Sequence, residues 1–154
     1  MGTYEYLRRV VDDELDTLFS ELSAIAIEGA KGVGKTVTAA RRANTIHALD
    51  TPGALDLAIA DPFRVVSGAT PILIDEWQRF PQTWDLVRRA VDADRTPARF
   101  LLAGSATPRD PGTHSGAGRI VRLRMRPLTL FERSQMEPSV SIANLLSGHR
   151  EPIS

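Results

Sequence analysis

The sequence predicts an α/β domain with three layers, in which helices cover both faces of a parallel sheet. Short apolar segments alternate with segments of helical periodicity along most of the chain, and this alternation is typical of parallel strands joined by helices. A glycine-rich segment also lies between the first apolar run and the helical segment that follows it. We therefore expect strands that are buried on both faces, as in other all-parallel sheets.

Composition limits the classes of protein to which the chain can belong. Its 154 residues, 42% hydrophobic and 25% charged, suit one globular domain with a buried core. The absence of cysteine excludes disulfides and thiolate metal sites, and a net charge of zero gives the whole chain no electrostatic attraction to nucleic acid. No apolar run is long enough to span a membrane, and the N-terminus has no secretory pattern. We expect a soluble, cytoplasmic protein.

The first part of the chain predicts a helix, a strand, a second helix and a second strand. Residues 11–22 carry apolar side chains on one helical stripe, and residues 24–27 form an apolar run typical of a buried strand. A helix is expected at 35–44 and a strand at 45–49. Short helical pieces are expected at 54–66.

The second part of the chain continues the alternation. A clear apolar strand is expected at 71–75, a helix at 83–94 and another apolar strand at 99–103. Residues 105–118 are rich in glycine, proline, serine and threonine and predict a mobile loop. A last strand is expected at 120–125.

Residues 29–36, Gly-Ala-Lys-Gly-Val-Gly-Lys-Thr, match the pattern G-x-x-x-x-G-K-[ST] at every fixed position. In such a P-loop, glycines let successive backbone N–H groups point at phosphate oxygens, and the following helix adds its positive dipole end. The pattern assigns the β- and γ-phosphates to Lys35 and a magnesium ion to the Thr36 hydroxyl. The candidate nucleotide-binding residues are Gly29, Ala30, Lys31, Gly32, Val33, Gly34, Lys35, Thr36 and Val37.

The expected ligand is ATP with Mg²⁺. A dinucleotide-binding loop is excluded because Val37 stands where the third glycine of its fingerprint belongs. No Asn-Lys-x-Asp segment for reading guanine is present, which favours ATP over GTP. Lys31 and Lys35 are the only lysines in an arginine-rich chain, so the chemistry of the loop, and not general composition, explains the lysine at position 35.

An acidic pair follows the strand expected at 71–75. An acid at the tip of a buried strand beside a P-loop reaches the magnesium shell, usually through water, so Asp75 joins Thr36 as a candidate metal ligand. Glu76 is then placed to orient and deprotonate a water that attacks the γ-phosphate. The competing interpretation is a strand that ends at a solvated surface. The apolar run leading into Asp-Glu after a P-loop favours the catalytic interpretation.

Two further catalytic candidates follow. In nucleotide hydrolases with a catalytic glutamate, a strand inserted between the P-loop strand and the aspartate strand ends in a small polar residue that contacts the attacking water and the γ-phosphate. Ser105 is the candidate here, with Thr107 as the alternative, against an ordinary strand-ending serine. Arg119 is a candidate to stabilise transition-state charge, in its own chain or in a neighbouring subunit. A solvated arginine is the competing interpretation.

Several segments together resemble a family of bacterial and archaeal ATPases with an AAA-like P-loop domain. They are residues 6–12, 28–36, 74–78, 102–105 and 118–132, and the likeness runs from about residue 4 to residue 135. The resemblance implies a sheet of the ASCE type, with the inserted strand and the catalytic glutamate described above, and ATP with magnesium. It also implies an ATPase domain at 1–135 with an N-terminal helix, and at 136–154 a tail that begins a missing or truncated second domain.

The first interpretation of function is hydrolysis of ATP to ADP and phosphate, which drives an attached domain or a partner. The alternatives are a non-hydrolysing nucleotide switch or remnant, a small-molecule kinase and a nucleic-acid-associated NTPase. Glu76 beside Asp75 favours the activation of water over the positioning of an acceptor hydroxyl. Arg122, Arg124 and Arg126 share one strand face, which predicts an exposed or docking surface rather than a nucleic-acid stripe. The expected partners are a nucleotide and a homo-oligomer or partner protein, without a membrane.

Overall fold

The computed structural model describes residues 6–105, 118–133 and 142–148. Internal contacts divide the chain into two units, one of residues 11–127 and one of residues 1–10 with 128–154. Thr107 and most of the loop expected at 105–118 lie outside the described residues. The expected division into an ATPase domain at 1–135 and a tail at 136–154 stays a prediction.

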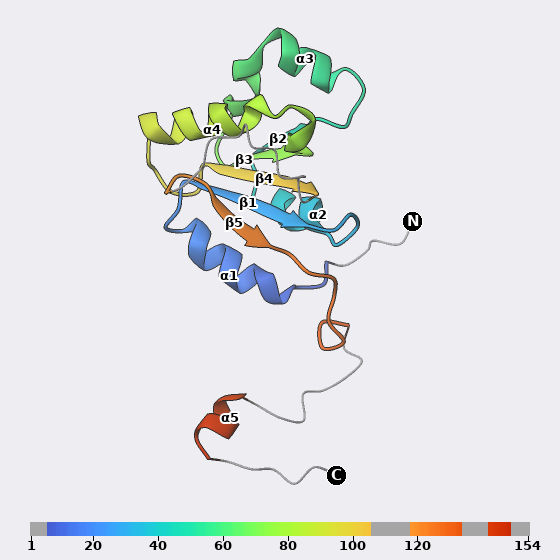
Figure 1. Ribbon diagram of the computed structural model, residues 1–154, viewed down its shortest axis with the longest axis vertical. Coiled ribbons are helices and arrows are strands. Elements are labelled where there is room, and N and C mark those ends of the chain that lie inside the picture. Colours follow the sequence, from blue (N-terminus) through green and yellow to red (C-terminus); the bar gives the residue numbers. More distant parts are fainter. Residues whose placement is uncertain (1–5, 106–117, 134–141, 149–154) are drawn as a thin grey trace. The chain divides into compact units, whose positions relative to one another are not determined.

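The larger unit is built on a five-stranded sheet in which every described pair of neighbouring strands is parallel. The strands are β1 (Ala24–Gly29), β2 (Thr45–Ala48), β3 (Ile72–Asp75), β4 (Phe100–Ser105) and β5 (Val121–Arg124). The helices are α1 (Val10–Phe19), α2 (Lys35–Ala40), α3 (Ala54–Ala60) and α4 (Gln82–Ala93), with short 3₁₀ turns η1 (Pro62–Val66) and η2 (Trp77–Arg79); a further helix, α5 (Ile142–Leu146), belongs to the smaller unit. Figure 1 shows these elements.

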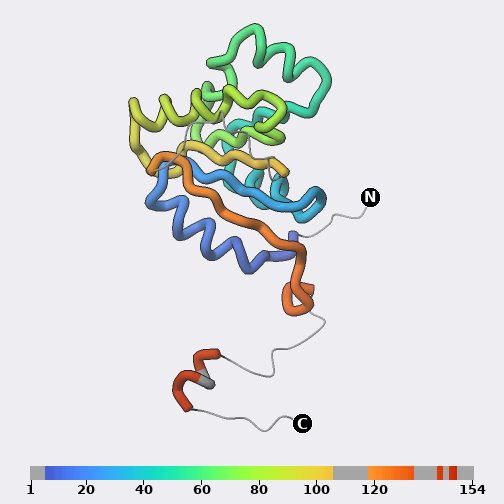
Figure 2. Tube along the Cα trace, viewed as in Figure 1, coloured from blue at the N-terminus to red at the C-terminus, as the bar shows by residue number. Residues whose placement is uncertain are grey.

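The strand order is β2-β3-β4-β1-β5, so β1 lies inside the sheet and β4 separates it from β3. Figure 2 shows the blue β1 between the yellow β4 and the orange β5, although these strands are far apart in the sequence. The predicted α/β class is confirmed, and β4 is the inserted strand that an ASCE-type sheet requires. Because all strands run the same way, their carboxyl ends share one edge of the sheet.

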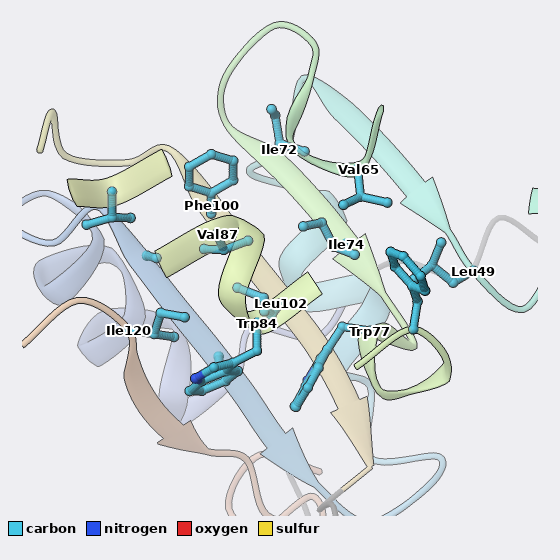
Figure 3. Close-up of a cluster of buried hydrophobic side chains, with 14 of the residues drawn as sticks. Leu49, Val65, Ile72, Ile74, Trp77, Trp84, Val87, Phe100, Leu102 and Ile120 are labelled. Atoms are coloured by element: carbon cyan, nitrogen blue, oxygen red, sulfur yellow. The ribbon is translucent and has the colours of Figure 1, made fainter. Parts of the chain in front are cut away.

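The two faces of the sheet pack against different helices. One face carries a cluster that includes residues of α1 and α2, namely Leu15, Phe19, Ile25, Ile27, Ala39, Leu73, Leu101, Ala103, Leu123 and Met125. The opposite face packs against α4 and its neighbours, and Figure 3 shows this second cluster. Trp77 and Trp84 lie in it with ring centroids 5.1 Å apart. Both indoles are buried in the core.

Two helices differ in length from the sequence prediction. α2 ends at Ala40 rather than near residue 44, because the N–H groups of Arg42 and Ala43 donate to carbonyls three residues back and tighten the chain into a turn. The first helix ends at Phe19, three residues early. Among the described residues, no helix has the length and apolar character needed to cross a membrane.

The smaller unit contains a buried ion pair between residues far apart in the sequence. Glu132 accepts hydrogen bonds from Arg9 Nε at 3.0 Å, from the Val10 N–H at 2.7 Å, and from the N–H and hydroxyl of Thr129 at 2.7 and 3.0 Å. Burial by itself raises the pKa of the Glu132 carboxyl, but these hydrogen bonds outweigh it and lower the pKa to about 2. The carboxylate therefore ties residues 9–10 to residues 129–132.

Candidate nucleotide-binding site

The P-loop leaves the end of β1 and enters α2, as the sequence predicts for a phosphate-binding loop. Gly32 and Gly34 have φ values of 82° and 98°, in a region that residues with a Cβ rarely adopt. Gly34 stands at the N-cap of α2, and no side chain caps that helix. The loop is therefore held by backbone geometry that needs glycine at these two places, and it offers main-chain N–H groups at the helix start.

Lys35 turns its side chain back over the loop. The residue is only 7% exposed, and its Nζ donates to the carbonyls of Gly29 at 3.0 Å and Ala30 at 2.8 Å. An ammonium group has three hydrogens, so one is left after these two contacts. The charge of Lys35 thus lies against the first two residues of the loop.

Thr36 connects the P-loop to the neighbouring acid. Its hydroxyl donates to Asp75 Oδ1 at 3.0 Å, and Asp75 is 7% exposed. Burial raises the pKa of the Asp75 carboxyl, and hydrogen bonds from Thr36 and from the Glu76 N–H only partly oppose that rise. The neighbouring residues therefore stabilise the charged form of this buried carboxyl less well than water does.

This donor set fits a magnesium ion. Mg²⁺ is held by one or two hard oxygen ligands from the protein, while phosphate oxygens and waters supply the rest. Thr36 and Asp75 offer a hydroxyl and a carboxylate within hydrogen-bonding distance of one another. Within the described ranges, no group of three or more His, Cys, Asp or Glu residues is arranged to hold a metal, so a cage made entirely of side chains is not the arrangement found in this part of the chain.

The structure brings Glu76 and Ser105 to the same edge. Glu76 follows β3 in a left-handed conformation with φ 50°, which turns the chain sharply after Asp75. Ser105 ends β4 and is paired in register with Gly29, the first residue of the P-loop. The carboxyl ends of β1, β3 and β4 thus carry the predicted candidates side by side.

The structure does not bring Arg119 to this group. Arg119 precedes β5, and β5 begins opposite Ile25 near the start of β1, so Arg119 lies toward the amino-terminal edge of the sheet. Its Nε contacts Asp92 Oδ1 of α4 at 2.5 Å. Arg119 therefore lies away from the P-loop of its own chain in this structure, and its role in catalysis, in its own chain or in a neighbouring subunit, stays a prediction.

Arg122 is less free than an exposed strand face suggests. Its Nε lies 3.4 Å from Glu28 Oε1, and its guanidinium carbon lies 5.0 Å from the centre of the Trp84 ring. Arg124 and Arg126, which share its face by alternation, are exposed. All three side chains are exposed, as predicted, and Arg122 in addition lies against Glu28 and Trp84.

One contact at the site was not predicted. The Gln78 side chain in η2 donates to both Glu76 and Ser105. The sequence places Gln78 two residues after Glu76, which was the only indication of a role at the site. The contact itself depends on the left-handed conformation of Glu76, which the residue pattern does not predict.

The fold and the site define a P-loop nucleotide-binding domain, and the comparison with protein families agrees. The profile of an AAA domain family matches residues 22–134, which is more than half of the chain. The chain belongs to this AAA domain family, as its sequence segments indicate.

Two curated relatives share part of this region. The uncharacterized proteins Rv2008c of Mycobacterium tuberculosis and Mb2031c of Mycobacterium bovis are each 40% identical to this chain over 75 residues. The matched stretch covers 47% of this chain and 17% of each relative. This chain therefore corresponds to a small part of the length of the relatives that it matches.

Proposed function

We propose that the chain binds ATP with Mg²⁺ on the P-loop and hydrolyses it to ADP and phosphate. The observation that supports this most strongly is the meeting of Lys35, the Thr36–Asp75 pair, Glu76 and Ser105 at the carboxyl ends of three parallel strands. Each group has a distinct task in phosphoryl transfer, in which catalysis consists mostly of positioning and charge stabilisation.

In the proposed complex, residues 29–37 surround the phosphates and direct backbone N–H groups at their oxygens. Lys35 exchanges its contacts with the Gly29 and Ala30 carbonyls for the β- and γ-phosphates. Thr36 and Asp75 hold Mg²⁺, which neutralises charge on the phosphate oxygens. The raised pKa of Asp75 is consistent with this role, because a cation beside the buried carboxylate supplies the missing stabilisation.

Hydrolysis requires a water oxygen to bond to the γ-phosphorus while the bond to the β-phosphate oxygen breaks. We assign the water's proton to Glu76, the carboxylate that follows the proposed metal ligand. Ser105, beside the P-loop on β4, donates its hydroxyl hydrogen to a γ-phosphate oxygen. We further propose that the ATP cycle moves an attached domain or a partner, and that Arg119 contributes to the site of a neighbouring subunit.

Magnesium-dependent phosphate release by the purified chain, measured over a series of protein concentrations, tests this function. We expect release that requires Mg²⁺ and ATP and no added acceptor. ADP production that depends on an acceptor would indicate a kinase instead. ATP binding without release would indicate a nucleotide switch, and the absence of ATP binding would refute the assignment of the P-loop.

A further inference from the structure

The side chain of Gln78 joins two groups of the proposed ATP site that belong to different strands. Its Nε2 donates to Glu76 Oε2, just after β3, and to Ser105 Oγ at the end of β4 over 3.2 Å. The amide nitrogen carries two hydrogens, so these two bonds use its full donor capacity. Gln78 is therefore a bridge between the proposed base and the proposed γ-phosphate contact.

The chemistry of the neighbours fixes which way the amide faces. An ionised carboxylate accepts hydrogen bonds and does not donate them, so only the nitrogen of Gln78 can face Glu76 favourably. The amide oxygen, Oε1, is buried without a hydrogen-bond partner among the described residues. Burying an unpaired acceptor costs free energy, and the two bonds made by the nitrogen offset that cost and hold the side chain in this orientation.

From these contacts we propose that Gln78 is a positioning residue for the hydrolysis of ATP, an inference that rests on the function proposed above. Because Gln78 donates to the Ser105 oxygen, the serine hydroxyl hydrogen is directed elsewhere and is available to a γ-phosphate oxygen. Because Gln78 occupies only Oε2 of Glu76, the other carboxylate oxygen is left to accept from the attacking water. One amide thus sets the hydrogen-bonding direction of both groups before ATP arrives.

The lack of a side chain at Gly104 leaves the space that the Gln78 amide occupies in this bridge. A Cβ at position 104 would lie 2.2 Å from Gln78 Oε1 and 3.0 Å from Trp77 Nε1. The nearest obstructing atom is the end of a flexible side chain, so Gly104→Ala is expected to displace the Gln78 amide rather than the strand. This gives a second way to break the bridge without changing the Gln78 side chain or either of the two side chains that it joins.

The kinetic test uses Gln78→Met, which keeps the side-chain length and removes both donors. We expect kcat for phosphate release to fall at least about tenfold, as for other small misplacements of reacting groups, while the affinity for ATP changes less than about twofold. Gly104→Ala should reproduce this split, and Gln78→Met should cost less in a Ser105→Ala background because the partners are coupled. Gln82→Met, an exposed glutamine at the start of α4, is the matched control and should leave kcat unchanged. A kcat within twofold of the wild-type value in Gln78→Met, or equal losses in both backgrounds, would overturn the proposal.

A second measurement does not depend on turnover. In a ¹⁵N-labelled protein, the Gln78 side-chain amide pair can be assigned by its loss in Gln78→Met. Its proton shifts should change in both Glu76→Ala and Ser105→Ala, and should not change in Gln82→Met. Amide proton shifts that stay unchanged in both Glu76→Ala and Ser105→Ala would refute the bridge, even if the enzyme is active. A wild-type chain that shows the shifts and binds ATP but releases no phosphate would instead refute hydrolysis, and the positioning role with it.

Discussion

The Thr36 hydroxyl donates a hydrogen bond of 3.0 Å to the Asp75 carboxylate. The bond ties the first turn of α2 to the end of β3, although β1, the strand that leads into the P-loop and α2, is separated from β3 in the sheet by β4. Since Asp75 is buried and its pKa is raised, the hydroxyl is one of the few groups that stabilise its charge. This pair is the place that we propose for Mg²⁺.

Replacing Thr36 by valine should lower the affinity of the proposed site for Mg²⁺. Thr36→Val keeps the shape of the side chain but removes the hydroxyl that we assign to the metal and to Asp75. We expect the Mg²⁺ concentration for half-maximal ATP binding to rise roughly tenfold or more, as for losses around other metal sites. Titration with Mg²⁺ at fixed ATP measures this. Thr17→Val, on the exposed side of α1, is the control, and an equal shift in both variants would contradict the assignment.

Removing the charge of Lys35 should remove most nucleotide affinity. Hydrogen bonds to charged groups contribute about 1.5–3 kcal/mol, so Lys35→Ala is expected to weaken ATP binding by roughly ten- to a hundredfold. Calorimetric titration of ATP checks this. Lys31→Ala should lose less, because that side chain is exposed at the rim of the loop. Unchanged affinity in Lys35→Ala would refute the P-loop assignment.

Glu76→Gln should separate binding from chemistry. The amide keeps the size of the side chain but cannot take a proton from water, so phosphate release should fall by about 10²–10⁴-fold. ATP affinity should remain close to that of the wild type. Single-turnover phosphate release and equilibrium binding, measured on the same preparation, give both values. Unchanged release would remove Glu76 from the mechanism, and Glu21→Gln on the exposed surface controls for the loss of charge.

Arg119 should affect phosphate release only when chains associate. Its contact with Asp92 lies at the other edge of the sheet from the P-loop, so Arg119→Ala is expected to leave phosphate release by dilute protein unchanged. If the arginine acts in a neighbouring subunit, the wild-type rate per chain should climb with protein concentration and the variant's rate should not. A loss in the variant that is the same at every concentration would contradict this expectation.

Glu132 should make the free energy of unfolding fall as the pH is lowered. Its pKa in the folded state, about 2, lies below that of an unfolded glutamate, about 4.3. The ionised carboxylate therefore contributes stability that is complete above about pH 4.3 and is lost as the pH falls through about 2. The shift corresponds to roughly 2–3 kcal/mol. Denaturant unfolding between pH 7 and pH 2 should show a smaller loss for Glu132→Gln than for the wild type, with Glu21→Gln as the control. Parallel curves would refute this contribution.

The sequence predicted the arrangement of the site where local pattern and sheet geometry suffice. Apolar runs that end in Asp75 or Ser105 mark parallel strands, and the carboxyl ends of such strands meet at one edge. The direction of the Gln78 side chain depended on the left-handed conformation of one residue, Glu76. Residues other than glycine rarely adopt this conformation, so the sequence did not predict it. The place of Arg119 depended on the register of β5 against β1, and register is a property of paired strands rather than of a single segment.

The ion pair of Arg9 with Glu132 determines where this chain can be cut. The family match begins at residue 22, so a truncated protein that follows it would keep the carboxylate and discard its cation. A buried charge that has lost its partner is strongly destabilising. Anyone trimming the domain for crystallisation or for fusion to a reporter should therefore retain the residues from position 9 onward, although they precede the conserved-domain boundary.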